Sequence, residues 1–135
     1  MQMTPTRPED TVIGQVLAKF VAADPQMFAL IAEDVDFRID HFRDETDVSW
    51  QRAATRDELV EVVTRLGTEV FPRGTRALSL ETFALGDGWV LTFFHQRFFY
   101  GVRGREVDSR TVILSHEAEG LLDFFRETVR GIEDL

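Results

Sequence analysis

The chain has 135 residues, a formal net charge of −9 at pH 7 and no cysteine. A chain of this length forms one hydrophobic core, so we expect a single domain over residues 1–135 with its core at about 7–130. The negative charge argues against binding to nucleic acid or to an anionic membrane surface, because both need clustered Lys and Arg. The lack of cysteine, of a signal-peptide pattern and of a long apolar run predicts a cytoplasmic protein.

Two helices are predicted near the N-terminus. Thr6 with Glu9 matches a capping box, and apolar residues recur at helical spacing after it, which predicts a helix over about 7–23. Asp24 followed by Pro25 predicts a second, short helix, because Asp is a good N-cap and Pro suits the first helical position.

A strand, a long loop and a third helix follow. Apolar and polar residues alternate over 35–41, which predicts a strand with one buried face. Residues 43–54 are polar and without pattern, and loops of this length are often functional. Thr55 with Glu58 forms a second capping box, and the helix it begins should end at Phe71-Pro72.

The second half of the chain predicts four strands. Their runs are separated by the turn sequences GDG, GVRG and SHEAEG, and they cover 75–85, 89–100, 105–116 and 121–130. The run 89–100 has Phe at both parities, so both of its faces should be covered. The element order ααβαββββ predicts an α+β fold in which three N-terminal helices pack on a curved antiparallel sheet.

This chain order resembles the SnoaL-like group of the nuclear-transport-factor-2-like superfamily over roughly residues 10–130. The segments that carry the resemblance are AEDVDF at the first strand and VILSHEAEGLLDFFRETV at the last hairpin. The resemblance implies a cone whose concave sheet face and helices enclose a pocket. We expect a small, largely apolar organic ligand in this pocket and no cofactor. It also implies a homodimer formed through the convex face of the sheet.

Turn lengths predict which side chains share a face of the sheet. If two hairpin loops have even length, His95 lies opposite Arg110, Arg97 opposite Asp108, and Arg110 opposite Phe125. The face that then points into the cone carries His95, Arg97, Asp108, Arg110 and Glu127, ringed by Leu80, Phe93, Phe99, Val112, Leu114 and Phe125. The other face carries Thr92, Phe94, Phe98, Ser109, Thr111, Leu122 and Phe124. A loop of odd length would exchange the two faces across its hairpin.

Three residues are catalytic candidates. A carboxylate in an apolar cone has a raised pKa, so Glu127 is the first candidate for an acid or base; the alternative is a structural ion pair with Arg110. His95 suits proton transfer as its partner, or is a packing residue. Arg110 could hold developing negative charge.

Seven further residues are candidates for ligand binding. Arg97 and Asp108 could bind a polar group, although a plain cross-strand salt bridge is the preferred interpretation for Arg97. His41 ends the first strand on the parity of Phe37 and could reach the mouth of the pocket, or lie on the surface. The apolar candidates are Phe20, Phe37, Phe93 and Phe125.

Two distant relatives of the same superfamily sharpen this expectation. In limonene epoxide hydrolases a catalytic Asp follows the last turn glycine by seven residues, which matches Glu127 counted from Gly120. Their central-strand Arg and Asp match Phe94 and Gln96, so epoxide hydrolysis is not expected.

The resemblance to ketosteroid isomerases leads to a similar result. Their base matches Ile39 or Asp40, their oxyanion Tyr matches Phe20, and their second Asp falls near Arg110. The isomerase set is mostly absent.

Other chemistries find little support in the sequence. The acidic run 40–47 has no second His at ligand spacing, so a solvated loop is favoured over a metal site, and we expect no metal. No Cys or nucleophile motif is present. The sequence therefore predicts a small-molecule-binding protein, with cofactor-free isomerase, cyclase, hydratase or hydrolase activity as one option. A non-catalytic ligand-binding or dimeric assembly module is the alternative.

Overall fold

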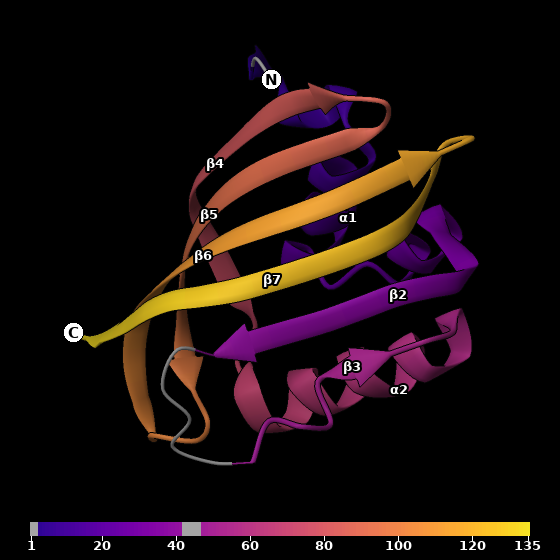
Figure 1. Cartoon of the computed structure of the whole chain (residues 1–135). Helices are drawn as coiled ribbons and strands as arrows, with labels where there is room; N and C mark the ends of the chain where they lie inside the picture. Colours follow the sequence, from indigo (N-terminus) through magenta and orange to yellow (C-terminus); the bar gives the residue numbers. More distant parts are fainter. Residues whose placement is uncertain (1–2, 42–46) are drawn as a thin grey trace.

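A curved seven-stranded sheet with helices on one side forms the molecule (Figure 1). The structure is a computed structural model and describes residues 3–41 and 47–135. The strands are β1 (Thr4–Thr6), β2 (Ile31–His41), β3 (Arg52–Ala53), β4 (Thr75–Gly86), β5 (Trp89–Tyr100), β6 (Arg105–Ala118) and β7 (Leu121–Asp134). The helical segments are η1 (Pro8–Asp10), α1 (Val12–Val21), η2 (Pro25–Leu30), α2 (Arg56–Arg65) and η3 (Leu66–Val70). None of the helices in the described ranges is long and apolar enough to cross a membrane.

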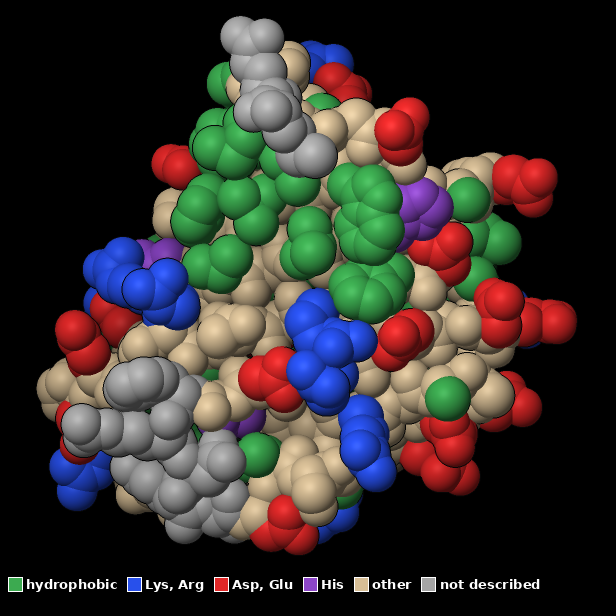
Figure 2. Space-filling model, in the orientation of Figure 1, with side chains coloured by type: hydrophobic (Ala, Val, Ile, Leu, Met, Phe, Trp, Pro, Cys, Tyr) green, Lys and Arg blue, Asp and Glu red, His purple; other side chains and the backbone are tan. Residues whose placement is uncertain are grey.

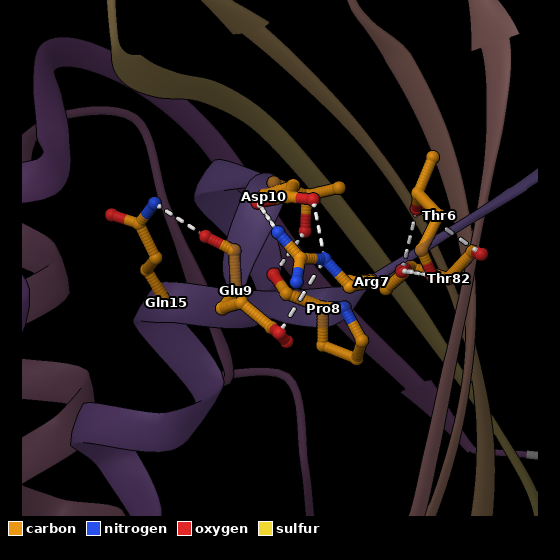
Figure 3. Close-up of polar contacts among 8 residues, drawn as sticks. Thr6, Arg7, Pro8, Glu9, Asp10, Gln15 and Thr82 are labelled. Carbon is orange, nitrogen blue, oxygen red and sulfur yellow. Dashed lines mark hydrogen bonds and ion pairs between the residues drawn. The ribbon is translucent and has the colours of Figure 1, made fainter.

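The first helix begins later than its sequence predicts. Thr11 is the N-cap of α1, where its hydroxyl accepts a hydrogen bond from the Gly14 amide at 3.0 Å. Thr6, the predicted cap, lies in β1 instead, and its hydroxyl is 2.7 Å from the Thr82 hydroxyl of β4 (Figure 3). The prediction of a helix from residue 7 is therefore wrong, because pairing with β4 competes for Thr6.

The other two predicted helix starts are confirmed. The Asp24 carboxylate accepts from the Gln26 amide at 2.9 Å, and the Thr55 hydroxyl accepts from the Glu58 amide at 3.1 Å. The helix after Asp24 is a 3₁₀ helix, η2. The helix after Thr55 is α2, which continues as the π-helical turn η3. Such turns are rare and often occur at functional sites.

The predicted α+β class and curved sheet are confirmed. The strand order is β1-β4-β5-β6-β7-β2-β3, and β4 to β7 form three antiparallel hairpins. One pair departs from the predicted antiparallel sheet, because β2 runs parallel to β7 with Ile39 opposite Glu127. No hairpin joins these two strands, so no short turn fixes their direction. The two-residue strand β3 and the three-residue strand β1 were also not predicted.

The hydrophobic core lies between the concave face of the sheet and the helices. Ile13 of α1, Leu59 of α2 and Ile113 of β6 are almost completely buried there. Phe37 of β2 and Phe125 of β7 stack with ring centres 4.6 Å apart. These contacts fix the helices over the middle strands, where the site described below is found.

Gly14 makes the closest backbone contact in the first helix and provides a test of the fold. A Cβ at this position would lie 1.9 Å from the Pro8 carbonyl oxygen. We expect Gly14→Ala to lower the free energy of unfolding by about 2 kcal/mol or more, because η1 must move. Gly67 of η3 has open space around its Cβ position, so Gly67→Ala is the matched control and should not destabilise. Urea denaturation of both variants measures their free energies of unfolding. Equal losses in the two variants would contradict the close packing of Gly14 against Pro8.

Candidate functional site

The concave face of the sheet carries the opposite parity to the one predicted for β5 and β6. On β5 the side chains of Phe94, Gln96 and Phe98 are buried, and on β6 those of Ser109 and Thr111. Four of these residues, Phe94, Phe98, Ser109 and Thr111, were predicted to lie on the convex face, and that prediction is wrong. The pattern of aromatic residues at both parities did not distinguish the two faces.

The predicted pairing of β5 with β6 is confirmed, but its charged residues lie on the outer face. His95 is opposite Arg110 and Arg97 is opposite Asp108, as the GVRG turn predicted. Arg110 is exposed, and Phe93, which has the parity of His95 on β5, is 41% exposed. Phe93 therefore does not line the interior, and neither do the four polar residues.

An irregularity in β7 separates Glu127 from these residues. Turn lengths predict Arg110 opposite Phe125, whereas Arg110 pairs with Gly131 and Phe125 pairs with Ser115. The register shifts where His116 faces Phe124 and Glu117 faces Leu122, so Asp123 is one extra residue in β7. The expected common face for Glu127 and Arg110 is therefore wrong, because Glu127 points inward and Arg110 outward.

The outer charged residues form a closed cluster. The guanidinium of Arg97 donates to the two Asp108 carboxylate oxygens at 2.7 and 3.1 Å, and His95 Nε2 lies 3.4 Å from Asp108. The Arg97 hydrogen bond holds the pKa of Asp108 below its usual range. The cross-strand salt bridge preferred for Arg97 is thus present, and His95 lies beside it rather than beside Glu127.

Inside the cone, a cavity of about 60 Å³ lies between the sheet and the helices. Glu127 and Gln96 are its polar residues; the others are Val16, Leu17, Phe20, Met27, Ile31, Phe37, Ile39, Leu59, Val63, Leu66, Phe71, Phe94, Leu122 and Phe125. Phe20, Phe37 and Phe125 therefore lie where a ligand-binding role would require them. We name this space the inner cavity.

A second cavity of about 40 Å³ adjoins the first. The two share five wall residues, Ile39, Leu66, Phe71, Gln96 and Glu127. The second cavity has a more polar lining, to which His41, Gln51, Tyr100 and Ser109 contribute. We name it the polar cavity. Glu127 therefore belongs to the walls of an apolar and a polar space at once.

Burial dominates the electrostatics of Glu127. Desolvation raises the pKa of its carboxyl group from 4.5 to about 7. Among the residues that the structure describes, none forms a hydrogen bond or ion pair with this carboxyl group. The other titratable side chains in the two cavity walls are His41 and Tyr100. Glu127 is thus poised to gain or lose a proton near neutral pH.

Gln96 is a site residue that sequence reasoning did not select. It shares the parity of Phe94 and Phe98 on β5, and an amide between two buried aromatic residues was the signal available for it. Thr75 donates a hydrogen bond to Gln96 Oε1 at 2.7 Å. This bond fixes the amide and leaves Nε2 as a donor for another group.

The described residues contain no cluster suited to a metal ion. No three His, Asp or Glu side chains come together within 3–41 and 47–135. The acidic run of the sequence analysis falls largely on residues 42–46, which lie outside the described residues.

Comparisons with known proteins identify the fold. No protein-family model and no curated protein sequence matches the chain. Among solved structures, an NTF2-like protein from Anabaena variabilis is similar with a TM-score of 0.69 at 14% identity, covering 89% of this chain and 87% of that one.

Two further structures are similar over most of their length. One is a proposed isomerase from Rhodopseudomonas palustris, with a TM-score of 0.66, 11% identity, and coverage of 93% of this chain and 90% of that one. The other is a proposed polyketide cyclase from Xanthomonas campestris pv. campestris, with a TM-score of 0.66, 13% identity, and coverage of 87% and 86%. The chain has the nuclear-transport-factor-2-like fold, as its sequence predicted.

The raised pKa of Glu127 predicts a specific pH dependence of stability. The folded protein holds the Glu127 proton up to about pH 7, whereas the unfolded chain releases it near pH 4.5. The contribution of Glu127 to the free energy of unfolding is highest below pH 4.5. It falls by about 3 kcal/mol in total as the pH rises from 4.5 to about 7. We expect Glu127→Gln to become more stable relative to wild type by this amount between about pH 4 and about pH 8.

Urea unfolding of wild type and Glu127→Gln across this pH range measures the difference in their free energies of unfolding. The contributions of the other titrating groups are the same in both proteins and cancel in this difference. A difference between wild type and Glu127→Gln that stays constant with pH would contradict the buried position of Glu127.

Proposed function

We propose that this protein binds a small, largely apolar organic molecule in its cone and transfers a proton to or from it through Glu127, without a cofactor. The reaction class is isomerisation, cyclisation or hydration. The observation that carries the proposal is a single carboxyl group, without a charged partner among the described residues, in the wall of an otherwise apolar cavity. The lack of cysteine supports a cytoplasmic location.

The size of the inner cavity limits how the ligand binds. At about 60 Å³ it is smaller than the roughly 150 Å³ of an engineered apolar cavity that accepts benzene. A surface groove of about 450 Å³ adjoins it between α1, η2 and η3, and Phe20, Met27, Val63 and Phe71 contribute to both spaces. We propose that the reactive end of the ligand enters the inner cavity when Phe71 shifts, while the apolar body stays in the groove.

The chemistry follows from the two polar wall residues. Ionised Glu127 removes a proton from a carbon next to a carbonyl group, and the electron pair moves to the carbonyl oxygen. Gln96 Nε2 donates a hydrogen bond to the resulting enolate oxygen. The protonated Glu127 then returns the proton to the same or a neighbouring carbon. A pKa of about 7 suits both steps, because each protonation state is populated near neutral pH.

This proposal uses a smaller set of catalytic residues than the sequence suggested. His95 and Arg110 lie on the outer face and contact neither cavity, so Gln96 takes the role expected of Arg110. Similar structures whose names refer to an isomerase and a polyketide cyclase support the reaction class but do not identify a substrate.

Deuterium incorporation tests the proton transfer. We expect the protein to catalyse saturable exchange at the α-carbons of 2-heptanone in D₂O, because its methyl ketone end is smaller than benzene and its alkyl chain can stay in the groove. Glu127→Gln should lower the catalysed rate about a hundredfold, since the amide cannot accept the proton. Proton NMR follows the loss of the α-hydrogen signals, and NMR shifts of cavity residues measure binding.

Glu133→Gln is the matched control, because Glu133 is exposed on the same strand, β7. Equal exchange rates in wild type and Glu127→Gln would rule out Glu127 as the base. Binding without exchange would favour a non-catalytic ligand-binding protein.

A second proposal, homodimer assembly, is supported by the outer face of the sheet. Figure 2 shows hydrophobic side chains gathered on this face in the upper part of the view, over β4, β5 and β6. Cross-strand pairing places Phe83, Trp89, Leu91, Phe93, Val112, Leu114 and Phe124 together there. Trp89 is 36% and Phe93 41% exposed. A contiguous apolar surface of this kind is typical of protein interfaces, and we propose that a second copy covers it.

Charge substitution tests this assembly. We expect a dimer mass for the wild type in light scattering and a monomer mass for Phe93→Lys, because burying a lysine in an apolar interface is costly. Val102 in the β5–β6 turn is also 41% exposed but lies outside the patch, so Val102→Lys should remain dimeric. A wild-type monomer at micromolar concentration would contradict the proposal.

A further inference from the structure

An acid or base enclosed by apolar side chains needs a route by which its proton equilibrates with water. The inner cavity does not provide one, because its remaining walls apart from Gln96 are apolar and it adjoins an apolar groove. Moving a hydrated proton through such a space is costly. The polar cavity on the other side of Glu127 has a different lining.

The polar cavity has the size and the lining of a hydration site. Its volume of about 40 Å³ exceeds the roughly 15 Å³ that a water needs. The polar side chains that line it come from five segments and are His41, Gln51, Gln96, Tyr100, Ser109 and Glu127. A buried water needs two to four such partners, so this space favours water over an apolar ligand group.

His41 lines the polar cavity but not the inner cavity. It ends β2 and also lines a surface hollow of about 240 Å³, together with Ile39 and Gln51, which contact the cavity as well. Its Nε2 lies 2.9 Å from Gln51 Oε1. Because that oxygen accepts, Nε2 carries a hydrogen, and Nδ1 of the neutral ring is left to accept one. The imidazole thus stands between the cavity and the surface hollow.

We propose that water in the polar cavity links Glu127 to His41, and that His41 exchanges the Glu127 proton with solvent. The inference rests on the proposed role of Glu127 in proton transfer and adds the step that resets it after each reaction. A proton leaves the Glu127 carboxyl for the water, the water passes a proton to the imidazole, and the imidazole releases one to the hollow. The return path is the reverse.

The charges around His41 are compatible with this role. Arg38, Asp40 and Arg52 line the surface hollow, and Tyr100 and Glu127 line the polar cavity. Arg38 and Asp40 form an ion pair at 2.9 Å, which neutralises both. His41 is therefore the titratable side chain that lines both the polar cavity and the surface hollow among the described residues.

Hydrogen–deuterium exchange of the Glu127 carboxyl group tests this route in the ligand-free protein. The infrared carbonyl band of protonated Glu127 is isolated as the difference between wild type and Glu127→Gln, at a pH about two units below 7. Rapid mixing with D₂O then gives the exchange rate. We expect His41→Asn and His41→Gln to slow exchange about tenfold or more, because neither amide relays a proton. Free imidazole should restore the rate.

His95→Asn is the matched control, because it makes the same change on the outer face and should leave the rate unaltered. Wild-type exchange in both His41 variants would overturn the inference. So would slow exchange that imidazole does not restore, or an equal effect in His95→Asn.

Failure of the proposed function is recognised separately. It appears as ketone deuteration that Glu127→Gln leaves unchanged, whatever the carboxyl exchange rates are. A missing Glu127 band would overturn both proposals.

Discussion

One extra residue in β7 determines which chemistry the interior of this protein contains. Asp123 interrupts the pairing with β6, and from Phe124 to Val129 the strand presents its other parity to the cone, until a second shift at Arg130. Without the shift, Glu127 would lie on the outer face with Arg110. The bulge is held in place by His116, whose Nδ1 lies 2.7 Å from the Asp123 carboxylate and whose Nε2 lies 3.0 Å from the Asp87 carbonyl oxygen. The hydrogen bond to Asp123 raises the pKa of His116 and favours the protonated ring, which donates to both.

Burying a carboxyl group in this way lowers stability at neutral pH, and an ordinary core would avoid it. A leucine of similar volume would fill the same space without a desolvation penalty. A buried ion pair would also relieve the penalty in part, but the nearest arginines of β5 and β6 are on the outer face, where Arg97 is bound to Asp108. The sheet thus separates its charges into a neutralised outer cluster and one inner acid. Perturbed acids without a structural partner are typical of functional sites.

The sequence predicted the elements of the fold much better than the faces of its strands. Turn glycines and the capping residues Asp24 and Thr55 act locally, so they were readable from the chain. Strand parity depends on the count of residues between paired positions, and a bulge changes that count without a sequence signal that we recognised.

The β5–β6 hairpin with its GVRG turn contains no bulge, so the pairing of His95 with Arg110 was correct. The parity of β5 itself was ambiguous, because Phe occurs at both of its faces. Glu127 lines the cavity although the register of β7 and the face of β5 were both predicted wrongly, because these two errors compensated each other.

In the proposed reaction, the geometry of the cone would separate the path of the ligand from the path of the proton. The walls shared by the two cavities contain Gln96 and Glu127, with apolar space on one side and polar space on the other. An apolar ligand gains free energy on the first side and would lose hydrogen bonds to the walls on the second. Water has the opposite preference. A reactive enolate formed in the inner cavity would therefore be kept from bulk water, while Glu127 would exchange its proton with solvent through the proposed water and His41. This division would keep proton exchange with solvent out of the apolar cavity, and it follows from the placement of the Glu127 carboxyl group at the boundary between the two spaces.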